Sequence, residues 1–225
     1  MRKGLAAAGL VIASIAAVTS AQAVPMIGIQ IYVDGVLDAS TALTAGGSAS
    51  LTDISNALFN TISVTAVGAP ASPDPNFGTI TISASSNFTT GSHTLTLVST
   101  QTGLTGSGFG ILANTFTYNG LSNPANVTSS IGQNFIDAGN TAYARTTLVA
   151  STPNEGGAVT YSSPVITYSP VPPPLFSETE VYSFTFIGQA LAQSSAQMVG
   201  VPEPMSLALL GTSLVGLGMV RRSRR

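Results

Sequence analysis

Apolar and polar residues alternate with a period of two along much of the chain from Val24 to Val199, as they do in strands that bury one face. In 27–33 the apolar positions are isoleucine and valine, and Asp34-Gly35 then supplies a favoured two-residue hairpin turn. The β-branched and aromatic residues of such runs suit a pleated, half-buried surface. The same pattern predicts further strands at 79–83, 94–97, 115–118, 145–150, 158–161, 164–168 and 181–186.

Glycine, proline, asparagine and aspartate separate these runs at short intervals. Many short strands punctuated in this way indicate an all-β fold, an antiparallel β-sandwich of jelly-roll type. Residues 24–188 are long enough for one such domain with a real core. Within it we expect a short helix at 53–60, where three apolar residues share a face. The prolines of 170–174 predict a stiff, extended loop between strands, which we favour over a proline-recognition ligand.

Residues 1–23 have the three parts of a secretory signal peptide. Arg2 and Lys3 form a basic start, 5–18 is apolar, and Ala21-Gln22-Ala23 is a small-x-small cleavage site. An apolar stretch of this length is short for a membrane span. We therefore expect a signal helix that is removed after Ala23, with the mature chain beginning near Val24.

The charge of the predicted domain differs sharply from that of the whole chain. The whole chain has a net charge of −2, but between the two ends Arg145 is the only cation beside eight acidic residues, which leaves −7. A domain with one cation cannot neutralise a phosphate backbone or bind an anionic membrane surface by charge. The composition therefore argues against nucleic-acid binding.

The chain contains no cysteine. An exported protein without cysteine has neither disulfides nor thiolate metal sites, so strand pairing and packing must stabilise it. This composition suits a Gram-negative envelope or secreted protein better than a small disulfide-bonded domain.

The C-terminal 25 residues combine a Pro-Glu-Pro motif, an uncharged apolar run and a basic end. As a helix, 205–220 would span about 24 Å at about 1.5 Å per residue, against a hydrocarbon core of about 30 Å. We therefore expect a marginal transmembrane helix there, with the arginine cluster at 221–225 in the cytoplasm and the domain outside. The small and polar residues of 189–200 predict a linker before this segment.

The motif Val201-Pro202-Glu203-Pro204, the apolar run and the four C-terminal arginines together resemble the PEP-CTERM sorting signal. A signal peptide at the other end is expected of that family. The resemblance covers 201–225 only. It implies that an exosortase recognises Pro202, Glu203 and Pro204 while 205–220 anchors the chain transiently in the inner membrane. The tail would then be removed and the domain delivered to the cell surface or extracellular matrix of an exopolysaccharide-producing Gram-negative bacterium. The basic residues it assigns to sorting are Arg221, Arg222, Arg224 and Arg225. The alternative is a permanently anchored protein in which the motif arose by chance.

Candidate catalytic residues are few. His93 is the only histidine, which excludes a mechanism with two histidines. Ser92-His93 could begin a nucleophilic site, although a histidine at a strand edge is the favoured interpretation. Glu178 and Glu180 lie two apart on one strand face and could meet the carboxylate spacing of a glycosidase, about 5–9 Å. Exposed edge charges that oppose aggregation are the favoured interpretation of this pair.

Binding chemistry is equally sparse in the sequence. Asp34, Asp38, Asp74 and Asp137 carry oxygens that calcium can use, but no calcium-binding loop is present, so we interpret them as turn-forming residues and predict no metal or cofactor. The two Asn-x-Thr triplets at 87–89 and 126–128 are interpreted as chance matches to the glycosylation pattern. Tyrosines could line a sugar-binding face, although core or sheet-surface positions are favoured because no tryptophan accompanies them. The tyrosines are Tyr32, Tyr118, Tyr143, Tyr161, Tyr168 and Tyr182.

These observations favour a non-enzymatic surface or matrix protein with a structural or adhesive role associated with exopolysaccharide. The first alternative is a carbohydrate-binding module with a defined sugar site. The second is an extracellular hydrolase, which requires a pocket that joins His93 or the Glu178/Glu180 pair to other polar groups.

Overall fold

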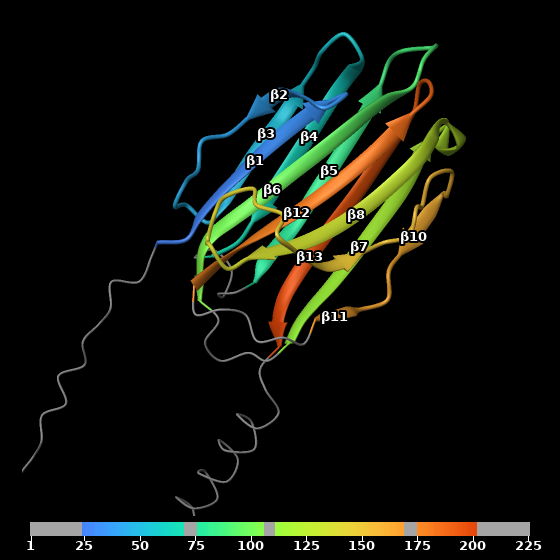
Figure 1. Ribbon diagram of the computed structural model, residues 1–225. Helices are drawn as coiled ribbons and strands as arrows, with labels where there is room; N and C mark the ends of the chain where they lie inside the picture. The colour runs from blue at the N-terminus through green and yellow to red at the C-terminus, as the bar shows by residue number, and fades with distance from the viewer. Residues whose placement is uncertain (1–23, 70–75, 106–110, 169–174, 202–225) are drawn as a thin grey trace, which may run out of the picture.

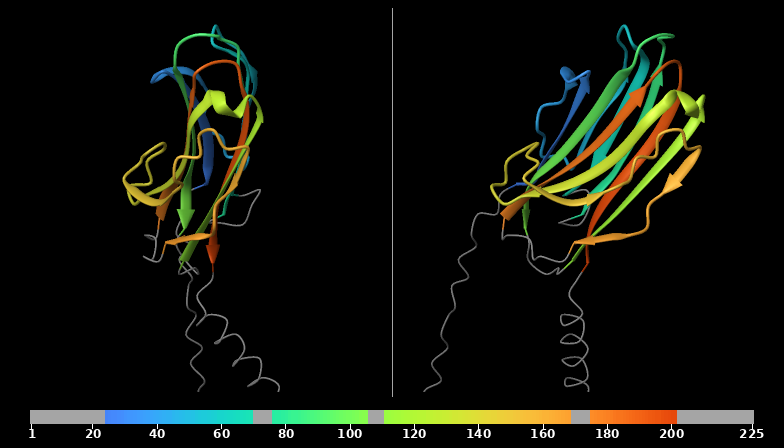
Figure 2. Two further views of the ribbon diagram at one scale, coloured as in Figure 1. Left: turned by 90° about the vertical axis from the view of Figure 1, so that its right-hand side faces the viewer. Right: turned by 45° about the vertical axis from the view of Figure 1, so that its right-hand side comes forward.

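The computed structural model describes residues 24–69, 76–105, 111–168 and 175–201. In this part of the chain two antiparallel sheets pack face to face as a β-sandwich (Figure 1). The view along the sandwich in Figure 2 separates the two layers. The predicted all-β, antiparallel sandwich is confirmed.

Sheet A has six strands and sheet B has seven. In spatial order sheet A consists of β2 (Val36–Ser40), β1 (Met26–Val33), β6 (His93–Thr105), β12 (Leu175–Phe186), β8 (Val127–Asp137) and β9 (Thr147–Ser151). Sheet B consists of β10 (Thr160–Ser162), β7 (Ile111–Ser122), β13 (Leu191–Val201), β5 (Phe77–Ser86), β4 (Phe59–Val67) and β3 (Ser48–Ile54), with β11 (Ile166–Tyr168) also paired to β7. A single 3-10 turn, η1 (Pro124–Asn126), precedes β8.

Aromatic rings fill much of the space between the sheets. Tyr182 and Phe184 on β12 stack with their ring centroids 5.5 Å apart, and Phe186 meets Phe59 of the facing sheet edge to face at 5.5 Å. Gly132 on β8 leaves room for such a ring, because a Cβ there would collide with Phe116. Period-two burial of large apolar side chains therefore builds one continuous core.

The hairpin between β1 and β2 has the predicted geometry. Asp34 and Gly35 adopt φ values of 51° and 80°, and Val33 pairs with Val36 across them. Positive φ at both central residues is the requirement of a type I′ turn, whose twist matches that of the flanking strands. The Asp-Gly prediction is confirmed.

The predicted helix at 53–60 is wrong. β3 ends at Ile54 and β4 begins at Phe59, and a turn built on Asn56 joins them. The Asn56 side-chain oxygen accepts hydrogen bonds from the backbone N–H groups of Leu58 and Phe59, both at 2.9 Å. A side chain that binds the backbone in this way closes a turn in place of a helix.

The predicted linker at 189–200 is also wrong, and so is the domain boundary at 188. Residues Leu191–Val201 form β13, which pairs with β7 on one side and β5 on the other. Its inward-facing residues are Ala192, Ser194, Ala196 and Met198. Because most of these side chains are small, the strand has a weak hydrophobic signal although it lies in the middle of sheet B. The domain therefore extends to Val201.

Several predictions concern parts of the chain outside the described residues. These are the signal helix, the proline-rich segment 170–174, Asp74, and the sorting segment with its transmembrane helix. Within the described residues, no helix has the length and apolar character needed to cross a membrane.

Candidate functional site

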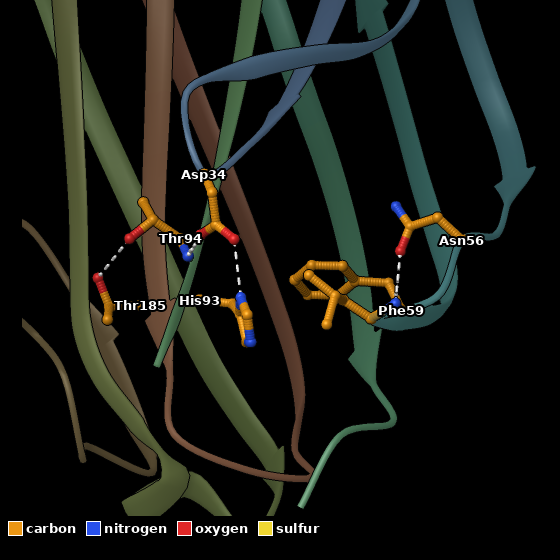
Figure 3. A network of polar contacts seen from close by, with 7 residues as sticks. Asp34, Asn56, Phe59, His93, Thr94 and Thr185 are labelled. Atoms are coloured by element: carbon orange, nitrogen blue, oxygen red, sulfur yellow. Dashed lines mark hydrogen bonds and ion pairs between the residues drawn. The ribbon is translucent and has the colours of Figure 1, made fainter. Parts of the chain in front are cut away.

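His93 begins β6 and binds the tip of the β1–β2 hairpin (Figure 3). Its Nδ1 lies 2.7 Å from Asp34 Oδ2, and the backbone N–H of Thr94 donates to Asp34 Oδ1 at 2.8 Å. These two hydrogen bonds, that from His93 foremost, lower the pKa of Asp34. Phe88 packs edge to face against the imidazole at 4.6 Å. The histidine thus fastens a hairpin to the start of a strand, in line with the strand-edge interpretation.

Glu178 and Glu180 are not exposed edge charges. They lie on β12, which β6 and β8 flank, and both side chains are fully buried. Glu180 pairs with Ser99 on one side and Asn134 on the other. Because Tyr182 and Phe184 continue the same face into the core, the carboxyl groups lie on the inner face of the sheet. The interpretation of this pair as exposed edge charges is wrong, because β12 lies inside the sheet between β6 and β8.

Polar side chains from both sheets surround this part of the interior. Asn134 donates through Nδ2 to the side-chain oxygen of Asn114 on sheet B at 2.9 Å, and Gln101 donates to the carbonyl of Ala69 at 3.2 Å. Within the described residues, neither carboxyl oxygen of Glu180 has a hydrogen-bond partner. Burial raises the pKa of Glu180 well above its usual value and so favours the protonated, uncharged acid.

The catalytic candidates do not come together. His93 pairs with Phe186, six residues along β12 from Glu180, and six strand residues span about 20 Å. His93 lies at the hairpin end of β6, whereas the Glu178/Glu180 pair faces the packed interior. Neither glutamate lines the hollow beside Tyr32 and Arg145 or the hollow beside Asn123. His93 and Glu180 therefore do not share one site.

The tyrosines divide between the core and one outer surface. Tyr118 and Tyr182 are buried between the sheets, and Tyr161 and Tyr168 pack against the core from β10 and β11. Tyr32 and Tyr143 instead lie at the outer face of sheet A, the face turned away from sheet B. Burial raises the pKa of Tyr143, and Tyr32 raises it further. Tyr32 is only partly buried, so its side chain can contact a sugar at this outer face.

The loop 138–146, between β8 and β9, folds back across β6 and β12 at this outer face (the yellow loop in Figure 1). Asp137 begins it, accepting from the N–H of Thr141 at 2.9 Å and from the Thr146 hydroxyl at 2.8 Å. These bonds lower the pKa of Asp137. Farther along, the Tyr143 N–H donates to Thr100 Oγ1 on β6 at 3.1 Å.

Two contacts add to this attachment of the loop. Asn140 accepts from the N–H of Gly103 at 2.6 Å, and the Ser177 hydroxyl donates to the carbonyl of Thr141 at 2.8 Å. Gly28 on β1 makes room for the loop, because a Cβ there would collide with the Tyr143 hydroxyl. The loop is therefore a fixed part of the outer face.

Beside this loop lies a hollow of about 320 Å³, which we call the Tyr32–Arg145 hollow. It is lined by Tyr32, Gly35, Thr96 and Arg145. Tyr32 pairs with Thr96 across β1 and β6, and Thr96 pairs with Ser183 of β12, with their hydroxyl oxygens 3.3 Å apart. An aromatic ring, a guanidinium and a row of hydroxyls thus surround one surface depression.

A second hollow, of about 310 Å³, lies at one end of the sandwich. Its side chains are mostly amides and hydroxyls, but several of them bind the backbone: Asn123 donates to the carbonyl of Gln189, and the Ser86 hydroxyl donates to that of Gly188. Its lining residues are Asn60, Ser85, Ser86, Ser122, Asn123, Gln189, Ala190 and Leu191. With polar groups already engaged and no aromatic ring in the lining, it is the weaker candidate.

No metal centre is evident in the described part of the chain, where histidine, cysteine, aspartate and glutamate nowhere form a group of three or more suited to an ion. Asp34 and Asp137 serve as turn and loop anchors. Asp38 accepts from the Asn56 side chain at 3.0 Å. The interpretation as turn-forming residues agrees with the contacts of Asp34 and Asp137, but Asp38 lies within strand β2 and not in a turn.

No protein-family model matches this chain, and neither does any curated protein sequence. Among solved structures it is similar to the carbohydrate-binding module TmCBM61, solved with β-1,4-galactotriose, at 10% identity and a TM-score of 0.35 over 69% of this chain and 90% of that one. It is also similar to the K1 cleaved adhesin domain of Lys-gingipain from Porphyromonas gingivalis W83, at 10% identity and a TM-score of 0.27 over 69% and 99% of the two chains. These TM-scores are too low to assign the chain to a family.

Among the residues that line the Tyr32–Arg145 hollow, Arg145 is the one for which the sequence pattern predicts the wrong secondary structure. Its position was predicted as the first residue of a strand, but β9 begins at Thr147 and Arg145 stands at the end of the anchored loop. The signal that could have singled it out was the charge count, since it is the only cation between residues 24 and 200.

Proposed function

We propose that this protein is a non-catalytic, polysaccharide-binding protein of the cell surface or extracellular matrix, with the Tyr32–Arg145 hollow as its sugar site. The observation that carries the proposal is the hollow itself. Sugars are bound by aromatic ring faces together with fixed hydrogen-bonding groups, and the hollow offers Tyr32, Thr96 and Arg145 within one depression. This favours a carbohydrate-binding module with a defined site over a passive matrix component.

The outer face of sheet A supports a polysaccharide over a small free sugar. Hydroxyl pairs continue from the hollow along β6 and β12, where Thr94 and Thr185 lie 3.4 Å apart. These threonines are only partly buried, so their hydroxyls can meet further sugar units of an extended chain. A binding surface that runs along strands suits a linear polymer.

Export and sorting are the second part of the proposal and rest on the two ends of the sequence. We propose that the signal peptide directs secretion, that 205–220 holds the chain in the inner membrane, and that an exosortase acts at Pro202-Glu203-Pro204. The last strand supports a sharper version of this idea. Because β13 extends to Val201, the motif follows the folded domain directly, with no linker between them. The processing enzyme would have to act close to the sandwich.

The binding proposal is tested with the purified protein on immobilised polysaccharides of differing charge and linkage. Wild type should bind at least one of them saturably, and Tyr32→Ala should weaken that binding about tenfold or more, since loss of a stacking ring and its hydrogen bonds costs about 1–3 kcal/mol. Gln193→Ala is the control, because Gln193 is exposed on sheet B. A wild-type protein that binds no polysaccharide would leave only the structural role.

Sorting is tested in the producing cells. Replacing Pro202, Glu203 and Pro204 by alanine should retain the protein in the inner-membrane fraction, whereas the wild-type domain is released. Release of the variant at the wild-type level would show that the motif has no sorting role.

A further inference from the structure

We infer that the Tyr32–Arg145 hollow selects an acidic polysaccharide, with Arg145 binding the carboxylate of a uronic acid unit. This inference rests on the proposed polysaccharide-binding function and adds the class of sugar. The decisive feature is the placement of charge. Arg145 is the only lysine or arginine between residues 24 and 200, and it lines this hollow.

The guanidinium of Arg145 is free to bind a ligand. It is exposed at the surface, and in the described part of the structure the ion pair found is that between His93 and Asp34, which does not involve it. The nearest carboxylate in the sequence to the lining residues is Asp34, next to Gly35. Both oxygens of Asp34 are held by His93 and Thr94. A charged donor without a carboxylate partner beside a hollow is suited to an anionic group.

The backbone of the loop that carries Arg145 is held in place by hydrogen bonds before any ligand binds. Two residues earlier, Tyr143 has φ of 61°, a left-handed conformation that is costly for a bulky side chain. The loop keeps this conformation because Tyr143 is tied to Thr100 and seated over Gly28, and Asp137 holds the loop at its start. Such attachment lowers the entropy cost of binding through Arg145.

The Tyr32 side chain, which also lines the hollow, is held in a defined orientation. Its hydroxyl donates to the side-chain oxygen of Gln30 at 2.8 Å, and its position on β1 places it directly across from Thr96. A sugar ring packed against Tyr32 would have its hydroxyls near Thr96 and its carboxylate toward Arg145. This combination matches a uronate unit, which has a ring, hydroxyls and one planar carboxylate.

The single cation of the hollow, Arg145, indicates which kind of anionic group the ligand carries. One guanidinium matches one carboxylate through two parallel hydrogen bonds. A sulfated or phosphorylated polymer has higher charge density and would face an otherwise acidic domain with a single cation to meet it. The acidic domain also repels a uronan at long range, so recognition depends on short-range contacts of Arg145, and salt screens both the attraction and the repulsion.

The test uses the full protein and three uronans, polygalacturonate, alginate and polyglucuronate, each beside its carboxyl-reduced, neutral counterpart. Wild type should bind at least one uronan about tenfold or more tighter than its reduced form, since hydrogen bonds to charged groups are the stronger ones. Arg145→Gln should remove this preference, so that its affinities for the acid polymer and the reduced polymer become alike. Arg145→Lys, which keeps the charge but lacks the planar fork, should fall between the two.

Each outcome decides one level of the argument. Equal binding of acid and reduced polymers, or an unchanged preference in Arg145→Gln, would overturn the carboxylate assignment while leaving polysaccharide binding intact. Tighter binding of dextran sulfate than of any uronan would also overturn it. Binding of none of these polymers, nor of any neutral one, would overturn the proposed function itself. Unfolding midpoints of the variants, matched to wild type, separate lost contacts from lost folding.

Discussion

At the scale of single residues, Glu180 is the largest departure from expectation. A pair of glutamates two apart on a strand is ordinarily a solvated face, because burying an ionised carboxylate is costly. Here the side chain faces the core between Ser99 and Asn134. Its raised pKa resolves the apparent conflict, since a protonated acid is a neutral polar group. The net charge of −7 counted from the sequence includes one negative charge for Glu180, and burial disfavours that charge.

This protonation makes stability depend on pH. The unfolded chain releases the Glu180 proton near its usual pKa, whereas the folded protein holds it to higher pH. The contribution is therefore fully present below the unfolded pKa and is lost as pH rises toward the folded one, by up to about 1.4 kcal/mol per pH unit. We expect Glu180→Gln to flatten this decline, as measured by urea unfolding from pH 4 to 8.

Glu180→Asp is the matched control for that experiment, because it keeps a titratable carboxyl at the same buried position. Its stability should still decline with rising pH, although a smaller side chain leaves a gap in the core. If Glu180→Gln declined as steeply as wild type, the pH dependence would originate elsewhere.

Asp34 shifts in the opposite direction from Glu180. Its pKa is lowered by His93 and the Thr94 N–H, so its contribution is present above the unfolded pKa and lost as pH falls through the folded one. The side chain is 45% exposed, which limits the effect of the pair to less than about 1 kcal/mol. Asp34→Asn should lower the thermal midpoint slightly at pH 7, and this difference should shrink in acid.

Asp53→Asn provides the comparison for Asp34. Asp53 is also exposed and also has positive φ, at 55°, a conformation that asparagine tolerates equally well. The same substitution without a His93 contact should leave the midpoint in place. Equal losses in both variants would mean that the His93 contact adds nothing.

At the scale of elements, the loop 138–146 connects the fold to the proposed site. Its hydrogen bonds run to β6, to β12 and to Asp137 at the end of β8, which explains how a segment without regular structure positions Arg145. Function on a loop held by a rigid scaffold is a common arrangement. The loop is therefore the element through which stability and binding should be coupled.

Asp137→Ala tests this coupling. The substitution removes the acceptor for the Thr141 N–H and the Thr146 hydroxyl, and a typical hydrogen bond contributes about 0.5–1.5 kcal/mol to stability. We expect faster amide hydrogen exchange in 138–146 and weaker uronan binding, with β4 and β5 in sheet B exchanging as in wild type. Uniformly faster exchange would indicate general destabilisation, and unchanged binding would separate the loop from the site.

Two of the strands that the sequence pattern did not reveal, β8 and β13, differ from β1 in what they bury. The inward positions of β1 are isoleucine and valine, so its alternation is plain. β8 and β13 bury serine, glycine, asparagine and alanine at many such positions, because rings such as Phe116 already fill the space or polar groups pair across it. Hydrophobic periodicity cannot detect a strand of that kind. The site was hidden for a related reason, since strand pairing and a loop bring Tyr32 beside Arg145 across a long sequence separation.

At the scale of the whole molecule, the sandwich is completed by its last strand. β13 lies between β7 and β5, so sheet B would be split into two parts without it, and Met198 and Ala196 would be lost from the core. The net stability of a domain is a small difference between large opposing free energies. Loss of a central strand should therefore prevent folding altogether. The C-terminal limit of the folded domain can therefore be located by testing which truncated chains still fold.

Two truncations should distinguish the limit at Val201 from the limit predicted at residue 188. A chain ending at Val201 is expected to show a cooperative thermal transition and resistance to proteolysis. A chain ending at residue 188 should show neither, because β5 and β7 would each have an unpaired edge in the middle of the sandwich. Matched cooperative transitions in both would mean that β13 is dispensable.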